Sequence, residues 1–300
     1  MTMTNKILTV TLNPSVDILY CTDTFEIGNV HRVAKVSKTA GGKGLNVSNV
    51  ADILGLNVTA TGFLGGPNGE FIKSLLEESG ITRDFVDVPM NTRNCINIAS
   101  GGSHTELLEE SDTVPFEYAE VLLRKIEQYD DIDFAVISGS LAAGIPVSIY
   151  GDIIRRLNDK KIKVIVDVNA DILKEVLKED IEIFMIKPNR EEAAALFRDE
   201  PVRPHGVEHL IVSLGADGLE CFNSSGRFKV SVPQEEVKNT VGSGDASVAG
   251  FIHGYSAGGL TQALQSMAAA GTANAVQETT GYIDINDYHN LLKKVSVRKV

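Results

Sequence analysis

Short runs of apolar, mostly β-branched residues recur along the chain and are separated by polar and glycine-containing segments. They occupy residues 7–12, 58–63, 134–138, 164–168, 183–186 and 210–213. An unbroken apolar run of this length is typical of a strand that is buried on both faces. Between most of these runs, apolar positions recur with helical spacing, at residues 45–54, 69–79, 117–128, 147–158, 170–177 and 191–197.

This alternation of strands and helices predicts an α/β fold with right-handed crossovers and a largely parallel sheet covered on both faces. After residue 245 the pattern changes to two long Ala-rich helices, 245–257 and 261–277, which are separated at Gly258-Gly259. No Pro- or Ser-rich linker divides the 300 residues. We therefore expect one main domain, residues 1–300, with insertions.

Two segments, residues 17–40 and 92–108, break the alternation. Both are polar and β-prone, and both follow residues that would lie at strand ends. Ligands of an open parallel sheet bind outside the carboxyl ends of its strands, so a small separate sheet formed by these insertions would act as a lid over the site. The alternative is a pair of ordinary surface hairpins.

The chain is acidic, with a formal net charge of −12 and 43% hydrophobic residues. A nucleic-acid partner would require a field of the opposite sign. No apolar run reaches the length of a membrane span, and the start from Met1 to Lys6 is too short and polar for a secretory signal. Cys21, Cys95 and Cys221 are far apart in the sequence, which favours a reducing, cytoplasmic setting.

A glycine-rich turn at 242–245 carries the strongest chemical signal. An extended run leads through Gly242-Ser243-Gly244 to Asp245 and then into a helix. Such a turn presents free backbone N–H groups and the positive helix end to an anion, while an ionised Asp245 can accept the proton of an attacking alcohol. This combination suits phosphoryl transfer to a hydroxyl. The alternative is a glycine-rich helix start with an ordinary capping aspartate.

A second glycine cluster, Gly41-Gly42-Lys43-Gly44, also precedes a helix. Its glycines permit close approach of a ligand, and Lys43 and Asn46 offer a charge and an amide. Neither cluster matches the P-loop or the GxGxxG dinucleotide fingerprint, which disfavours a dehydrogenase.

Five motifs in a fixed order resemble the PfkB (ribokinase-like) family of carbohydrate kinases over nearly the whole chain. They are AGGKGLNVSNVADILG from residue 40, SGSLAAG from 138, KPNREEAA from 187, SLGADG from 213 and TVGSGDASVAGF from 240. The resemblance implies a ribokinase-like three-layer α/β/α sandwich with a small β-sheet lid. It also implies that Asp245 is the catalytic base, with Gly242, Ser243 and Gly244 as an amide cradle for the transferred phosphoryl group.

The runs TLNPSVD, residues 11–17, and TRNCINI, residues 92–98, resemble the branch of that family that acts on sugars already carrying a phosphate, such as 1-phosphofructokinases and tagatose-6-phosphate kinases. A guanidinium binds phosphate through a planar fork, so Arg93 would read the existing phosphate. A solvated charge or a structural salt bridge is the alternative for Arg93. The other substrate-binding residues that family position implies are Asp17, Arg32, Gly41, Gly42, Lys43, Asn46 and Ser140.

The resemblance also implies ATP and Mg²⁺ as cofactors. Glu192 is placed near the metal, although it could equally be a first-turn residue favoured by the helix dipole. The residues implied on the nucleotide side are Lys187, Asn189, Ser213, Gly215, Gly218 and Asn274.

The implied activity is ATP-dependent phosphorylation of a ketohexose phosphate to the bisphosphate, with tagatose 6-phosphate, fructose 1-phosphate or fructose 6-phosphate as acceptor. A kinase of unphosphorylated sugars or nucleosides and a non-catalytic sugar-phosphate sensor are the alternatives. Exposed lid edges are consistent with a homodimer formed through the lid. One departure affects the lid: Glu109-Glu110-Ser111-Asp112 replaces the Gly-Pro that phosphofructokinase relatives typically carry after the lid strand.

Overall fold

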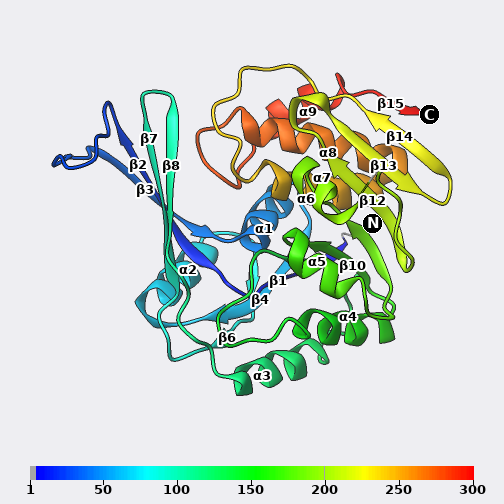
Figure 1. Ribbon diagram of the computed structural model, residues 1–300, viewed down its shortest axis with the longest axis horizontal. Coiled ribbons are helices and arrows are strands. Elements are labelled where there is room, and N and C mark those ends of the chain that lie inside the picture. Colours follow the sequence, from blue (N-terminus) through cyan, green and yellow to red (C-terminus); the bar gives the residue numbers. More distant parts are fainter. Residues whose placement is uncertain (1–4, 199) are drawn as a thin grey trace.

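A long central sheet organises the computed structural model, which describes residues 5–198 and 200–300. Most of the segment considered as a leader, Met1 to Thr4, lies outside the described residues. The strand order is β15-β14-β13-β12-β11-β10-β9-β1-β4-β5, with β6 paired to β4 (Figure 1). The strands of this sheet are β1 (Lys6–Thr11), β4 (Asn57–Leu64), β5 (Thr82–Arg83), β6 (Val86–Asp87), β9 (Phe134–Ser138), β10 (Lys163–Asp167), β11 (Ile183–Ile186), β12 (Val207–Ser213), β13 (Leu219–Asn223), β14 (Gly226–Val230) and β15 (Val297–Lys299).

The predicted parallel core of the sheet is confirmed. Strands β12, β11, β10, β9, β1 and β4 pair in parallel, while β12, β13, β14 and β15 continue the sheet with antiparallel pairs. The antiparallel end was not expected. Its strands are short and mix buried with half-exposed positions, so they lack the unbroken apolar runs of the other strands.

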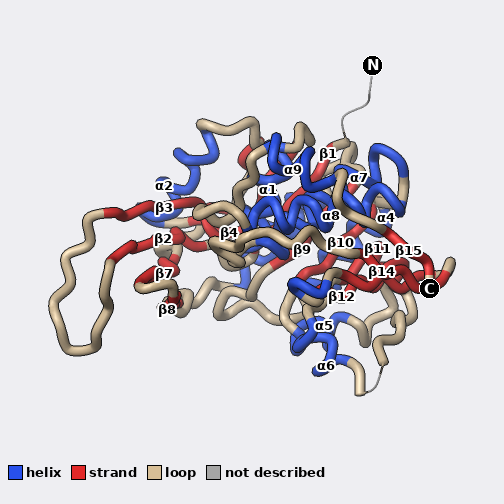
Figure 2. The backbone as a smooth tube through the Cα atoms, turned by 90° about the horizontal axis from the view of Figure 1, so that it is seen from above, coloured by secondary structure: helices blue, strands red, loops and turns tan. Residues whose placement is uncertain are grey.

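Helices cover both faces of the sheet, as the alternation predicted. The helices are α1 (Lys43–Ile53), α2 (Gly66–Glu77), α3 (Phe116–Ile126), α4 (Ile149–Asp159), α5 (Ala170–Val176), α6 (Arg190–Leu196), α7 (Ser243–Gly258), α8 (Leu260–Ala275) and α9 (Ile285–Leu292). Two buried apolar clusters result: one includes residues of α1, α2, α7, α8 and α9, and the other residues of α3, α4, α5 and α6. Figure 2 shows α8 and α6 on opposite sides of the strands.

Neighbouring residues of β1 show why the strands are apolar throughout. Ile7 belongs to one cluster and Leu8 to the other, and both are fully buried. Because successive side chains of a strand point to opposite faces, a strand between two helical layers needs apolar residues at every position. The three-layer α/β/α prediction is thus confirmed.

A second, four-stranded sheet stands apart from the helical layers and is called the lid here. Its order is β3-β2-β7-β8, with parallel pairing only between β2 and β7. Its strands are β2 (Ser15–Thr22), β3 (Lys35–Gly41), β7 (Arg93–Ser100) and β8 (Ser103–Leu108). The lid projects to the upper left in Figure 1, and the prediction of a small separate sheet from the two insertions is confirmed. In the described part of the chain, no helix combines the length and apolar character that crossing a membrane requires.

Helix α7 carries Asp245 in its first turn and packs closely along α8. A Cβ atom added to Gly250 of α7 would lie 2.5 Å from the carbonyl oxygen of Ser266 and 2.6 Å from Cβ of Ala270. The helices therefore approach each other at a distance that only glycine permits at this position. This packing fixes the position of α7, and with it that of Asp245, relative to α8.

Gly250→Ala should lower the free energy of unfolding by about 1–3 kcal/mol, because an added methyl group overpacks the helix interface. Gly258→Ala is the matched control on the same helix, since its Cβ would meet only the flexible end of the Gln262 side chain. Urea unfolding followed by circular dichroism measures both. Equal stability of the two variants would contradict the close packing at Gly250.

Candidate active site

A cleft of about 550 Å³ lies between the lid and the carboxyl ends of the central strands. Residues at or just after the ends of β1, β9, β10, β11 and β12 form its floor: Asn13, Gly139, Asp167, Lys187 and Ser213. This is where open α/β sheets bind ligands. The predicted residues that line the cleft are Asp17, Gly42, Lys43, Asn46, Arg93, Ser140, Lys187, Asn189, Glu192, Ser213, Gly242, Gly244 and Asp245.

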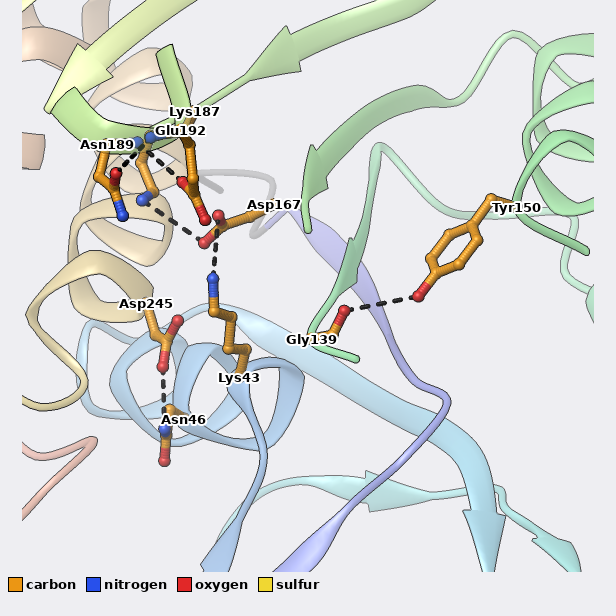
Figure 3. Close-up of polar contacts among 9 residues, drawn as sticks. All are labelled: Lys43, Asn46, Gly139, Tyr150, Asp167, Lys187, Asn189, Glu192 and Asp245. Atoms are coloured by element: carbon orange, nitrogen blue, oxygen red, sulfur yellow. Dashed lines mark hydrogen bonds and ion pairs between the residues drawn. The ribbon is translucent and has the colours of Figure 1, made fainter. Parts of the chain in front are cut away.

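A buried carboxylate bridges two lysines on the floor of the cleft (Figure 3). Asp167 is 2% exposed, and its two oxygens lie 3.4 Å from Nζ of Lys43 and 3.5 Å from Nζ of Lys187. Burial opposes ionisation of Asp167, but the two lysines outweigh it and lower the pKa of the carboxyl group. Asp167 in turn is the main cause that raises the pKa of Lys43. The floor thus offers two ammonium groups to an anionic ligand.

Asp245 lies buried beside this network. Its carboxylate is 5% exposed by residue area and accepts a hydrogen bond of 2.8 Å from Nδ2 of Asn46. Burial and then the nearby Asp167 carboxylate raise the pKa of Asp245 to about 7, while Lys43, Asn46 and Lys187 act in the opposite direction. We expected an aspartate that is ionised at neutral pH, so this result corrects that expectation. A carboxyl group that titrates near neutral pH can both accept and release a proton there.

The amide groups at the start of α7 point to an anion site. Gly242 has φ of 82°, in the left-handed region, and the helix begins at the next residue. Within residues 5–198 and 200–300, the N–H groups of Gly244 and Asp245 have no hydrogen-bond acceptor. A Cβ atom at Gly244 would lie only 3.1 Å from Nζ of Lys187, so the ammonium group sits directly beside the turn. Free amides and an ammonium together form a cradle for a phosphate group.

Asn189 and Glu192 form a capping box at the start of α6. The Asn189 side chain accepts from the N–H of Glu192, and the Glu192 carboxylate accepts from the N–H of Asn189, each at 2.9 Å. Both residues also line the cleft. Glu192 therefore lies in the first turn of α6, as we considered, and it also closes a capping box. The second oxygen of its carboxylate remains near the cleft.

The lid contributes alternate side chains to the roof of the cleft. Arg93, Cys95 and Asn97 of β7 line it, as does Asp17 of β2, which lies beside Cys95 in the strand register. Residues two apart on a strand share one face, so these side chains all point toward the floor. Burial raises the pKa of Asp17, while the hydroxyl of Ser15, which donates to it at 2.7 Å, and the positive charge of Arg93 lower it.

Two residues predicted to bind substrate do not line the cleft. Arg32 is exposed in the loop between β2 and β3, beyond the strands of the lid, and its position does not support a substrate contact. Arg32 was assigned by family position alone, and its contact with the substrate stays a prediction. Gly41 affects the cleft only through Asp17, since any side chain at position 41 would overlap the Asp17 carboxylate.

The other predicted residues outside the cleft are Ser243, Gly215, Gly218 and Asn274. Asn274 is fully buried, and its amide binds the carbonyl of Val241 at 2.9 Å and the N–H of Gly281 at 3.0 Å. It holds the glycine-rich turn in place instead of facing a nucleotide. The N–H of Ser243 already donates to the carbonyl of Thr240 at 3.2 Å. Gly215 and Gly218 both have positive φ around a 3₁₀ turn after β12, which explains these glycines without a ligand.

Sequence reasoning missed several residues of the cleft. Asp167 is the most important, and the signal was a carboxylate at the end of the otherwise apolar strand VIVD. Asn13 was also missed, although it follows β1 in the same way and donates to the hydroxyl of Ser140 at 3.1 Å. Cys95 could not be predicted, because its neighbours in the sequence do not show whether its side chain points into the cleft or to the outer face of the lid.

Comparisons with known proteins agree with this geometry. Residues 10–286 match the family described as pfkB family carbohydrate kinase. The tagatose-6-phosphate kinase of Staphylococcus epidermidis (strain RP62A) is 37% identical, and the alignment covers 98% of this chain and 100% of that protein. A crystal structure assigned as a phosphofructokinase from Staphylococcus aureus has a TM-score of 0.84 at 32% identity, covering 98% of this chain and 99% of that one.

Phosphofructokinase-2 from Escherichia coli, solved in complex with potassium, has the same fold. Its TM-score is 0.88 at 24% identity, with 97% of this chain and 99% of that chain covered. The family match spans most of the chain, and the relatives are covered from end to end. The resemblance drawn from the five sequence motifs is therefore confirmed, and this chain belongs to the PfkB family of carbohydrate kinases.

Proposed function

We propose that this kinase transfers the γ-phosphoryl group of ATP to the free primary hydroxyl of a ketohexose phosphate and forms the bisphosphate. Tagatose 6-phosphate, fructose 1-phosphate and fructose 6-phosphate are the candidate acceptors. The relative with 37% identity is named for tagatose 6-phosphate, which supports this substrate class. The cleft supports it independently, because it combines an arginine of the lid with a carboxylate at the amide-rich start of α7.

The environment of the Arg93 guanidinium is the observation on which this proposal depends. It lines the cleft, and among the described residues no carboxylate lies within 4.0 Å of its guanidinium. Its Nε is buried without a partner, and its Nη1 donates to the neutral main-chain oxygen of Glu109 at 3.0 Å. An arginine that faces a cleft and forms no ion pair within 4.0 Å among the described residues is well suited to bind a phosphate that arrives with the substrate.

The sugar would lie between the roof and the start of α1. The Asp17 carboxylate can accept hydrogen bonds from its hydroxyl groups, and the glycine at 42 lets the sugar approach the main chain. Lys43 and Ser140 would help to hold the phosphate. Asn46 would have a further part, because its amide donates to Asp245 and would orient that carboxylate.

The triphosphate would occupy the other half of the cleft, near Lys187, Asn189 and Ser213. Proteins usually bind Mg²⁺ through one or two carboxylates, waters and substrate phosphates. The described residues hold no cluster of three potential metal ligands. Glu192 offers one carboxylate beside the phosphate cradle, and one protein carboxylate is enough for a metal ion that is bound mainly by the phosphates of the nucleotide. When bound, Mg²⁺ would neutralise charge on the phosphate oxygens.

Asp245 would act as general base in the transfer. As the hydroxyl oxygen of the sugar bonds to the γ-phosphorus, its proton passes to the carboxylate of Asp245, and the bond from the γ-phosphorus to the bridging oxygen breaks to release ADP. The free N–H groups of Gly244 and Asp245, with the ammonium of Lys187, stabilise the charge on the transferred group. The lid keeps water from competing as acceptor.

We also propose that two copies pair through the lid. Val36 and Leu107 are about half exposed on lid strands, and Ile27 and Val30 are almost fully exposed at the tip of the β2–β3 loop. Burying such side chains against a second lid would stabilise a dimer.

A coupled assay for ADP release tests the reaction itself. The protein should turn over at least one of the three ketohexose phosphates with ATP and should be far less active with fructose. Asp245→Asn should lower kcat by about 10²–10⁴-fold while ATP still binds, because the variant lacks only the proton acceptor. Binding without turnover in the wild type would instead indicate a sensor. Higher activity with fructose would indicate a kinase of neutral sugars.

The pH dependence of kcat/KM should follow Asp245, whose pKa is about 7. The ionised form is active, so kcat/KM should fall about tenfold per pH unit below pH 7 and level off above it. A sugar phosphate itself titrates near pH 6, so the test is a comparison. Asp167→Asn should move the midpoint to lower pH with the same substrate, because a like charge is removed. An unmoved midpoint would contradict the assignment.

Arg93→Ala should raise KM for the sugar phosphate by about 10²-fold or more and leave KM for ATP nearly unchanged, because a charge-assisted contact to the phosphate is lost. Arg32→Ala is the matched control, since this arginine belongs to the same lid but is exposed and outside the cleft. Steady-state kinetics with both substrates varied measure the two effects. An unchanged KM in Arg93→Ala would reject Arg93 as the phosphate reader.

A further inference from the structure

A small polar network ties the root of the lid to the main body. It consists of Asn68 at the start of α2, Asn94 on β7 and Glu109 just after β8. Asn94 and Glu109 stand opposite each other, one residue beyond the paired positions Cys95 and Leu108. The network therefore lies at the end of β7 and β8 that joins the lid to the main body.

Glu109 holds this root through both its side chain and its main chain. Its carboxylate accepts from the N–H of Asn94 at 2.7 Å and from Nδ2 of Asn94 at 3.1 and 3.0 Å. Its main-chain oxygen accepts from Nη1 of Arg93 at 3.0 Å, and its N–H donates to the carbonyl of Asn94 at 3.2 Å. One residue thus binds both Arg93 and the residue that follows it.

Asn94 carries the connection on to the body. Its side-chain oxygen accepts from Nδ2 of Asn68 at 3.0 Å, and the same Nδ2 donates to the carbonyl of Thr92 at 2.7 Å. Both neighbours of Arg93 are therefore anchored: Thr92 through its carbonyl to α2, and Asn94 through its N–H to Glu109 and through its side chain to α2. Such anchoring restricts the positions that the Arg93 guanidinium can reach.

The carboxylate of Glu109 does not neutralise the arginine. Among the described residues no ion pair joins it to Arg93 within 4.0 Å, although it bonds the adjacent amide. Its negative charge is directed to Asn94, while only the neutral carbonyl of Glu109 faces the guanidinium. The arrangement orients Arg93 and leaves its charge available for an anion.

We propose that Glu109 is a positioning residue for the sugar-phosphate site. The hydrogen bonds from Asn94 to the Glu109 carboxylate hold the root of the lid in place, and the main-chain carbonyl of Glu109 then orients the Arg93 guanidinium toward the cleft. This inference rests on the proposed role of Arg93 in binding the substrate phosphate. It gives a function to Glu109, the first residue of the segment Glu109-Glu110-Ser111-Asp112 that follows the lid strand.

The test is the split between KM and kcat in Glu109 variants of the full chain, with the best sugar phosphate as substrate. Glu109→Ala should raise KM for the sugar phosphate by about five- to tenfold, because the lid root loosens and Arg93 loses its fixed orientation. The values of kcat and of KM for ATP should stay within about twofold, since neither Asp245 nor the nucleotide half of the cleft touches Glu109.

Two further variants separate positioning from charge and from general stability. Glu109→Gln keeps an oxygen that can accept from Asn94, so it should restore KM to within about twofold of the wild type. Glu110→Ala is the neighbouring control, because this exposed residue makes no side-chain hydrogen bond or ion pair with the described residues. A lower KM in both Glu109 variants would overturn the proposal, since Glu109 would then act by repelling the phosphate. A parallel loss of kcat and thermal stability in Glu109→Ala would also overturn it.

A double-mutant cycle distinguishes this inference from the proposed function. If Glu109 acts through Arg93, Glu109→Ala should have no additional effect on KM in the Arg93→Ala background. If Arg93→Ala alone leaves KM unchanged, the phosphate-reader role fails. If Arg93→Ala raises KM while Glu109→Ala does not, or if the two effects multiply, only the positioning role of Glu109 is refuted.

Discussion

The site depends on the placement of two carboxylates and two lysines at the buried ends of the central strands. Asp167 lies between Lys43 and Lys187, and Asp245 lies beside them with a hydrogen bond from Asn46. Charged groups are costly to bury without partners, so this arrangement is stable because the opposite charges compensate one another. It also gives Asp245 an unusually high pKa for an aspartate, because burial and the neighbouring carboxylate both disfavour its ionised form.

The same network joins four parts of the chain that are separated in sequence. Lys43 begins α1, Asp167 ends β10 and Lys187 follows β11, while the turn before α7 supplies the free amides. The close packing of α7 on α8 at Gly250 sets where these amides lie. The lid covers the space above them with Arg93. The cation for a substrate phosphate therefore belongs to the lid and the base for the proton to helix α7, and both line one cleft.

Much of the architecture could be predicted from sequence because burial on both faces leaves an unbroken apolar run. The six core strands, the helices between them and the lid insertions followed from this pattern. The antiparallel strands β13, β14 and β15 did not, since strands that are only partly buried carry no such signal. The glycine-rich motifs indicated most of the cleft.

Sequence could not reveal the raised pKa of Asp245 or the bridging role of Asp167, because both arise from contacts between residues far apart in the chain. Arg32 and Asn274 were assigned by family position alone, and the structure places the first on the lid loop and the second in the core.

A crystal structure of Asp245→Asn with a ketohexose phosphate and a non-hydrolysable ATP analogue tests the central claim most directly. The account predicts the sugar phosphate group on the guanidinium of Arg93, the free primary hydroxyl within hydrogen-bond distance of residue 245, and the γ-phosphate of the analogue on the amides at the start of α7. A sugar bound with its phosphate away from Arg93, or with no hydroxyl near residue 245, would contradict it.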